Sequence, residues 1–92
     1  EVESALKEAM EGTDVRVNEF TVAPQITPTE GLPYHEWFIE FENELDNLED
    51  FALRIDAAMR KQNVYYDDLI VGHVLRTLVI TRRVALELVH LG

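Results

Sequence analysis

The 92-residue sequence contains no cysteine, and this absence excludes disulfide bonds, zinc–thiolate sites and thiol catalysis. A reducing compartment is therefore permitted, and we expect a cytoplasmic location. Ser4 is the only serine and lies at an end that would fray, so no credible serine nucleophile is present. The four glycines are isolated from one another and form no phosphate-binding loop. The chain alone therefore does not look like an enzyme.

Long apolar runs are also missing. No stretch approaches the roughly 20 residues of a membrane span, and no signal peptide is visible, so we expect no membrane partner. The net charge is −10, and residues 1–53 carry 14 acids against 2 bases. Nucleic-acid phosphates would be repelled by such a surface, so no nucleic-acid partner is expected. The acids can be a solvated face, or they can complement a basic surface on another domain.

The most informative stretch that is present is residues 34–42, which hold four of the eight aromatic side chains. His35, Trp37, Ile39 and Phe41 alternate with more polar neighbours, and this two-residue period predicts a β-strand with one face in the core. The only tryptophan lies in the middle of this strand. We therefore expect the rest of the domain to pack around Trp37.

The remaining chain predicts further elements around this strand. An amphipathic helix over residues 2–10 stops at Gly12, and a second strand over residues 15–23 is halted by Pro24. Asn47 has the character of an N-cap for a second helix ending near Lys61, and residues 77–81 predict a third strand. Residues 63–68 are expected to break the second helix, residues 69–75 fit either a helical turn or extended chain, and residues 82–92 are not assigned.

This order, α-β-β-α-β, predicts one α+β domain over residues 1–92 with two helices and a small antiparallel or mixed three-stranded sheet. It matches most of a ferredoxin-like unit, with the strand before the first helix missing. A chain of this length buries about 60–65% of its unfolded surface and can form one modest core.

No constellation of side chains predicts chemistry. The pair His35-Glu36 would need a second histidine at position 39 to bind zinc as the protease motif does, and Ile39 stands there. The three histidines have no ligand-like spacing, so no metal site is expected. Glu36 and Glu40 share a strand face, but a general acid–base pair also needs a pocket. Tyr65 and Tyr66, followed by two aspartates, could hold a small molecule or a cation, or could simply cover the end of the core.

Three segments, residues 18–24, 34–41 and 61–70, resemble the C-terminal domain of bacterial members of the auxin-responsive-promoter (Gretchen Hagen) family of acyl-acid amido synthetases. The similarity covers roughly residues 5–81. It implies an adenylate-forming enzyme whose N-terminal domain binds ATP, Mg and a carboxylic acid, makes an acyl-adenylate, and passes the acyl group to an amine such as an amino acid. This chain would be a mobile lid that closes over that N-terminal adenylation domain of the same polypeptide, binding no cofactor alone.

The sequence departs from the family pattern in two places. Many relatives have a basic residue after the tyrosine of the third segment, where this chain has Asp67. Relatives also show a glycine followed by an aromatic after the last strand, and residues 82–92 lack this pair. The only lysines are Lys7 and Lys61. No catalytic residue is therefore carried over.

Six residues are predicted to face the large domain. Phe20, Val22 and Phe38 are expected to give apolar character to the sheet face opposite Trp37, more than a free two-layer domain needs. The other three lie after the second helix: Tyr66, Asp67 and Arg76. The alternative is a stand-alone ferredoxin-like module for interaction or small-ligand sensing, which would form a homodimer through its sheet.

Overall fold

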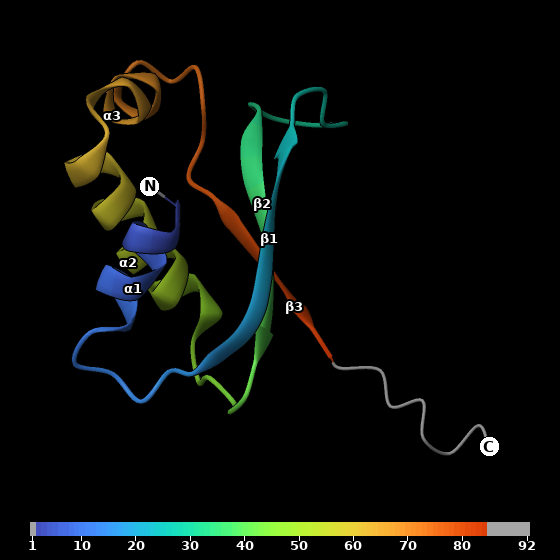
Figure 1. Cartoon of the computed structure of the whole chain (residues 1–92). Coiled ribbons are helices and arrows are strands. Elements are labelled where there is room, and N and C mark those ends of the chain that lie inside the picture. Colours follow the sequence, from blue (N-terminus) through green and yellow to red (C-terminus); the bar gives the residue numbers. More distant parts are fainter. Residues whose placement is uncertain (1, 85–92) are drawn as a thin grey trace.

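The computed structural model describes residues 2–84, which form two layers: helices cover one face of a sheet, and the other face is bare (Figure 1). The predicted α+β class is confirmed, with three helices in place of the two expected. The elements in chain order are α1 (Val2–Met10), β1 (Val17–Gln25), β2 (Tyr34–Phe41), α2 (Leu48–Gln62), α3 (Val64–Val71) and β3 (Val79–Arg83).

The sheet has the strand order β1-β2-β3 and is mixed. β1 and β2 are antiparallel, whereas β2 and β3 are parallel and are joined by a crossover through α2 and α3. β2 is therefore the central strand. In a split βαβ unit another strand would separate the two parallel strands, but here they pair directly. Pro24 does not end β1, because β1 is an edge strand and a missing N–H costs nothing on its open side.

The core lies between the helices and one face of the sheet. Trp37 and Ile39 are fully buried there, and Phe41 is nearly so. Phe20 stacks on Trp37 with ring centroids 5.7 Å apart. The helices add a set of small and medium apolar side chains to this core: Ala5, Leu6, Ala9, Phe51, Ala52, Ile55, Ala58 and Met59.

The expectation that Phe20 and Val22 lie opposite Trp37 is wrong. In the pairing register Phe20 is the partner of Ile39 and Val22 is the partner of Trp37, so both side chains point into the core. An alternating pattern separates the two faces of a strand but does not say which face is inward, and only the register settles this. Phe38, whose partner is Thr21, does lie on the opposite face as expected.

Local polar contacts end and begin the helices. Gly12, with φ of +74°, follows the last turn of α1. Arg54 of α2 donates from Nε to the Ala9 carbonyl at 2.9 Å and from Nη2 to the Glu11 carbonyl at 3.0 Å. A guanidinium here satisfies free carbonyls and suits the negative end of the helix dipole. Asn47 caps α2 as predicted, because its Oδ1 accepts from the Asp50 N–H at 3.0 Å.

Asn63 ends α2 as predicted, but the chain then begins a new helix instead of leaving helical structure. The Asn63 Oδ1 accepts from the N–H groups of Tyr65 at 3.0 Å and Tyr66 at 3.2 Å, so one residue closes α2 and caps α3. The third strand lies two residues later than predicted. It ends at Arg83, within the C-terminal residues that the sequence left unassigned. Residues 85–92 lie outside the described part. Among residues 2–84, no helix has the length and apolar content needed to cross a membrane.

Replacing the central tryptophan tests this core directly. Trp37→Ala should lower the free energy of unfolding by about 3–5 kcal/mol, because it removes a fully buried ring and leaves a cavity. Such a loss is a large part of a typical total of about 5–15 kcal/mol. Urea unfolding followed by circular dichroism measures it. Tyr65→Ala, at a site that is 79% exposed, is the control and should change stability little. Equal unfolding midpoints for the two variants would contradict this packing.

Candidate interdomain surface

The inward side of α3 is tied to α2 by a buried hydrogen bond. Tyr66 is 4% exposed and Asp56 is 5% exposed. The Tyr66 hydroxyl donates to the Asp56 Oδ1 at 2.6 Å. Burial, followed by the bond to the Asp56 carboxylate, raises the pKa of Tyr66 well above its usual range. The phenol therefore stays protonated and acts as the donor that compensates a buried carboxylate.

Charged and aromatic neighbours surround this pair. Arg60 Nε lies 2.6 Å from the Asp67 Oδ1, and its Nη1 lies 3.9 Å from the Asp56 Oδ2. The bond with Asp67 raises the pKa of Arg60. His35 of β2 stacks on the Tyr66 ring at 5.9 Å, and burial lowers the pKa of His35. These contacts fix α3 against both α2 and the sheet.

The paired tyrosines and aspartates therefore have different roles. Tyr66 covers the end of the core, in agreement with the simpler of the two sequence interpretations, and Asp67 is bound to Arg60. Tyr65 points to solvent. Within residues 2–84, no three side chains of histidine, aspartate or glutamate come together in a way that could hold a metal ion.

Most of the exposed side chains of α3 are apolar. The α3 outer face consists of side chains that are each at least 40% exposed: Val64, Tyr65, Leu69, Val71 and, in the turn that follows, Val74. Tyr66 is the only buried residue of α3, and Asp68 is an exposed acid among the apolar side chains. Exposed apolar side chains gathered on one short helix are a candidate contact surface. The composition of residues 64–71 carried this signal, but it was missed because no helix was predicted there.

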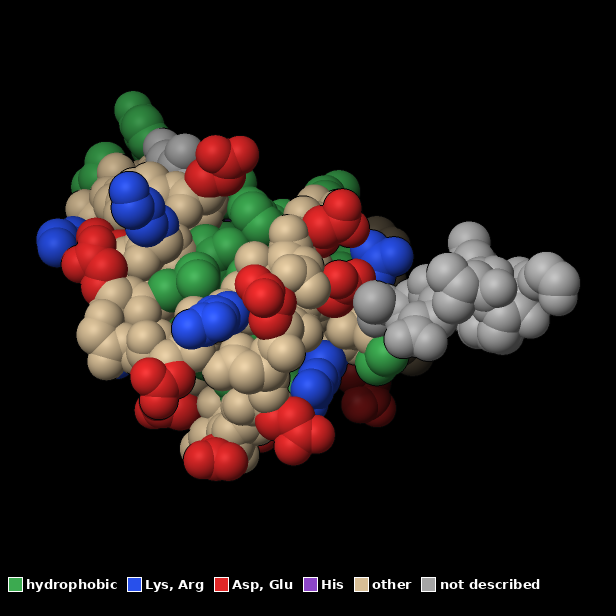
Figure 2. Space-filling view, turned by 60° about the horizontal axis from the view of Figure 1, so that its bottom comes forward, with side chains coloured by type: hydrophobic (Ala, Val, Ile, Leu, Met, Phe, Trp, Pro, Cys, Tyr) green, Lys and Arg blue, Asp and Glu red, His purple; other side chains and the backbone are tan. Residues whose placement is uncertain are grey.

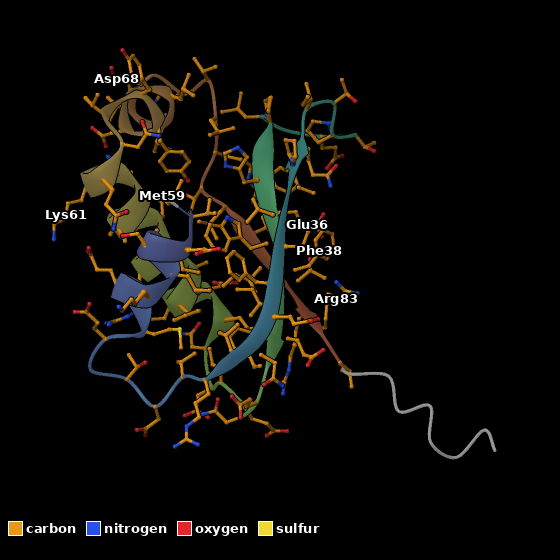
Figure 3. All side chains as sticks on the ribbon, viewed as in Figure 1. Glu36, Phe38, Met59, Lys61, Asp68 and Arg83 are labelled. Carbon is orange, nitrogen blue, oxygen red and sulfur yellow. The ribbon has the colours of Figure 1, made fainter. Side chains whose placement is uncertain are left out.

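The outer face of the sheet is more polar. Figure 3 shows Glu36, Phe38 and Arg83 pointing away from the helices. Both oxygens of Glu36 are engaged, one with the Thr81 hydroxyl and the other with the Gln25 amide at 3.1 Å. Glu40 accepts from the Asn18 amide at 3.1 Å. These carboxylates lie on an open face and are bound to neighbouring strands, so they do not form an acid–base pair in a pocket.

The two lysines and Arg76 lie on the surface or contact neighbouring elements of the same domain. Lys7 is exposed on α1. Lys61 extends from α2 on the side away from the sheet (Figure 3), and its Nζ lies 3.5 Å from the Glu8 Oε2 of α1. The guanidinium carbon of Arg76 lies 5.0 Å from the centre of the Tyr34 ring, a cation–π contact that joins the segment before β3 to the start of β2. Of the two lysines in the described residues, Lys61 has an ion pair with one acid, Glu8, and Lys7 is exposed.

The predicted interdomain residues are thus divided among several environments. Phe20 and Val22 pack into the core, Tyr66 is buried, and Asp67 is paired with Arg60. Phe38 is half-buried on the sheet outer face and Arg76 is exposed. Their contact with a larger domain stays a prediction. Acidic side chains are spread over several parts of the surface in Figure 2, with basic ones among them and hydrophobic side chains between.

The chain is thus a small α+β domain whose polar groups stabilise its own fold and whose last helix exposes apolar side chains. It matches the GH3 family C-terminal domain over residues 1–83 and belongs to that family. The GH3 family includes auxin-responsive acyl-acid amido synthetases, so the resemblance seen in the sequence is confirmed at this level. A bacterial type stays a prediction. No curated protein and no solved structure matches the chain significantly.

The buried hydrogen bond can be tested by removing one hydroxyl. Tyr66→Phe leaves the ring in place but leaves the buried Asp56 carboxylate without its closest donor. We expect the free energy of unfolding at pH 7 to fall by about 1–3 kcal/mol. Tyr65→Phe is the matched control, since that ring is exposed, and it should have almost no effect. Urea unfolding of both variants gives the comparison, and equal small changes would contradict the role of this bond.

The same variant predicts a pH dependence. The pKa of Tyr66 is raised in the folded state above the value of about 10 expected in the unfolded chain. Its contribution to stability is therefore complete below pH 10 and is lost as the pH rises further, because the unfolded chain then gives up the proton first. Above that pH, the wild type should lose about 1.4 kcal/mol per pH unit relative to Tyr66→Phe. Unfolding curves at pH 8, 10 and 11 test this, and a difference that stays constant would contradict it.

Proposed function

We propose that this domain is the lid of an ATP-dependent acid–amido synthetase that works through an acyl-adenylate. The observation that carries the proposal is the family match over residues 1–83, which spans nearly all of the described chain. In this function an N-terminal adenylation domain of the same cytoplasmic polypeptide holds ATP, Mg and the acid, and the lid closes over the adenylate. Closure would exclude water from a reactive intermediate and so favour amide formation over hydrolysis.

The α3 outer face supports such a role. Burying an exposed Val, Leu or Tyr side chain contributes about 1.5–3 kcal/mol each, and several are available here: Val64, Tyr65, Leu69 and Val71. The cost of fixing two domains in place offsets much of this gain. The net docking energy is then small enough for a lid that must open again. The Tyr66–Asp56 bond keeps α3 rigid beneath this face, so that the apolar side chains dock as one unit.

Homodimerisation through the sheet, the alternative function, has weaker support. Phe38 is an apolar residue on the bare face, but Glu36 and Glu40 flank it on the same strand. Two copies packed face to face would remove water from Glu36, Glu40 and Arg83, and burying charged groups has a cost that one apolar side chain offsets poorly. The sheet outer face is thus poorly suited to contact itself.

Reconstitution from separate domains tests the lid function. The chain is mixed with the N-terminal adenylation domain of an acid–amido synthetase from the GH3 family, and amide formation is measured with the acid, ATP, Mg and amine. We expect the chain to raise the rate of amide formation, while the chain alone makes no adenylate. No gain with an adenylation domain that is active in pyrophosphate exchange would count against the proposal.

A charged substitution on the α3 outer face sharpens this test. Leu69→Glu should reduce the gain at least tenfold, because a buried unpaired carboxylate opposes docking. Ile26→Glu is the matched control, since Ile26 is an exposed loop residue outside α3, and it should leave the gain unchanged. Melting curves must show that both variants remain folded. Equal activity of the two variants would mean that the lid docks through another surface.

A further inference from the structure

The two edges of the sheet differ in how they are protected. β1, at one edge, contains Pro24 and a β-bulge between Val17 and Glu19. Both features hinder the pairing of another strand. β3, at the other edge, pairs only with β2 on its inner side and has neither a proline nor a bulge in its register. Within residues 2–84 no element pairs with its outer side, so its backbone groups there form a template for a further strand.

An apolar groove runs beside this open edge. It has a volume of about 600 Å³ and lies between the first turns of α2 and the segment that leads into β3. Its apolar walls include Leu48 and Leu53 from the helix, and Leu78 and Ile80 from the strand side. Leu53 is 58% exposed. A strand added to β3 would direct every second side chain into this groove and the others toward the bare face, beside Thr81 and Arg83.

The charged side chains of residues 76–84, which include β3, are all basic. Arg76, Arg82 and Arg83 are exposed and form no ion pair with another described residue, although Arg76 rests on the Tyr34 ring. The only acid that lines the groove is Glu49, on the helix side. Glu40 and Glu42 line a second hollow together with Arg82 and Arg83, yet in a chain with a net charge of −10 the stretch 76–84 itself carries three bases and no acid. It complements a segment that carries carboxylates.

We propose that the open edge of β3 binds an extended acidic polypeptide segment as a fourth strand, with alternating apolar and acidic side chains. Backbone hydrogen bonds to β3 supply affinity, and the groove and the arginines select the side chains. This binding does not depend on the lid function. A second copy of this chain is a poor occupant, because its own β3 carries two arginines and no carboxylate that could complement this edge.

A synthetic peptide tests this proposal. The probe is a capped, dye-labelled heptapeptide of alternating valine and glutamate, compared with the same peptide carrying lysine in place of glutamate. Fluorescence anisotropy measures binding to the full chain at low salt, and hydrogen exchange measured by NMR reports on the β3 amides. We expect the glutamate peptide to bind at least tenfold more tightly than the lysine peptide, and to protect amides within Val79–Arg83 but none within β1.

Charge variants supply the control. The double variant Arg82→Glu/Arg83→Glu should weaken binding of the glutamate peptide at least tenfold, whereas Lys7→Glu/Arg16→Glu, with the same change in net charge, should weaken it less than threefold. Equal binding of the two peptides, no binding of either, or equal effects of the two double variants would overturn the proposal. Protection of the β3 amides without any peptide would also overturn the proposal. If that protection grows with protein concentration, a second copy occupies the edge; if it does not, the chain itself fills the edge.

Discussion

Burial of the Trp37 side chain is the constraint on which the other packing contacts depend. The ring lies in the middle of the central strand, Phe20 stacks on it from β1, and Ile80 is its register partner on β3. Its indole N–H has no hydrogen-bond partner within residues 2–84. The position is therefore held by apolar packing alone, which must also offset the cost of an unpaired donor, a cost of about 1–3 kcal/mol. This need explains why all three helices gather on one face of a sheet with only three strands.

The polar network between α2 and α3 has a different purpose. It joins two helices that are separated only by Asn63, and it does so with a buried carboxylate whose donor is a tyrosine that stays protonated. A polar bond of this kind adds little net stability compared with an apolar contact, but it allows one geometry only. The result is a short helix of fixed orientation, with Tyr66 and Ile70 packed on the core and mostly apolar side chains exposed. Because an eight-residue helix alone is unstable in water, α3 depends on these contacts.

The sequence predicted those parts of the fold that local rules determine. The strand around Trp37, the stop at Gly12 and the cap at Asn47 each follow from a residue type at a required position, and the structure confirms them. The orientation of β1 depends on its register with β2, which is a nonlocal choice, so Phe20 and Val22 were assigned to the wrong face. The sequence does not predict α3, because apolar residues are distributed around most of this helix, with only Asp67 and Asp68 between them, and therefore show no helical period.

The surfaces show the same division between local and nonlocal information. The α3 outer face is exposed, and the β3 edge is open, because no other described element packs against them. The periodicity of a sequence segment does not tell which other segments pack against it. The two surfaces are nevertheless independent, because no residue of α3 lines the groove beside β3. One is apolar and suits a compact domain, whereas the other combines backbone groups with arginines and suits an extended acidic segment. Since they share no element, the two proposals can be tested separately, by substitutions in α3 and in β3.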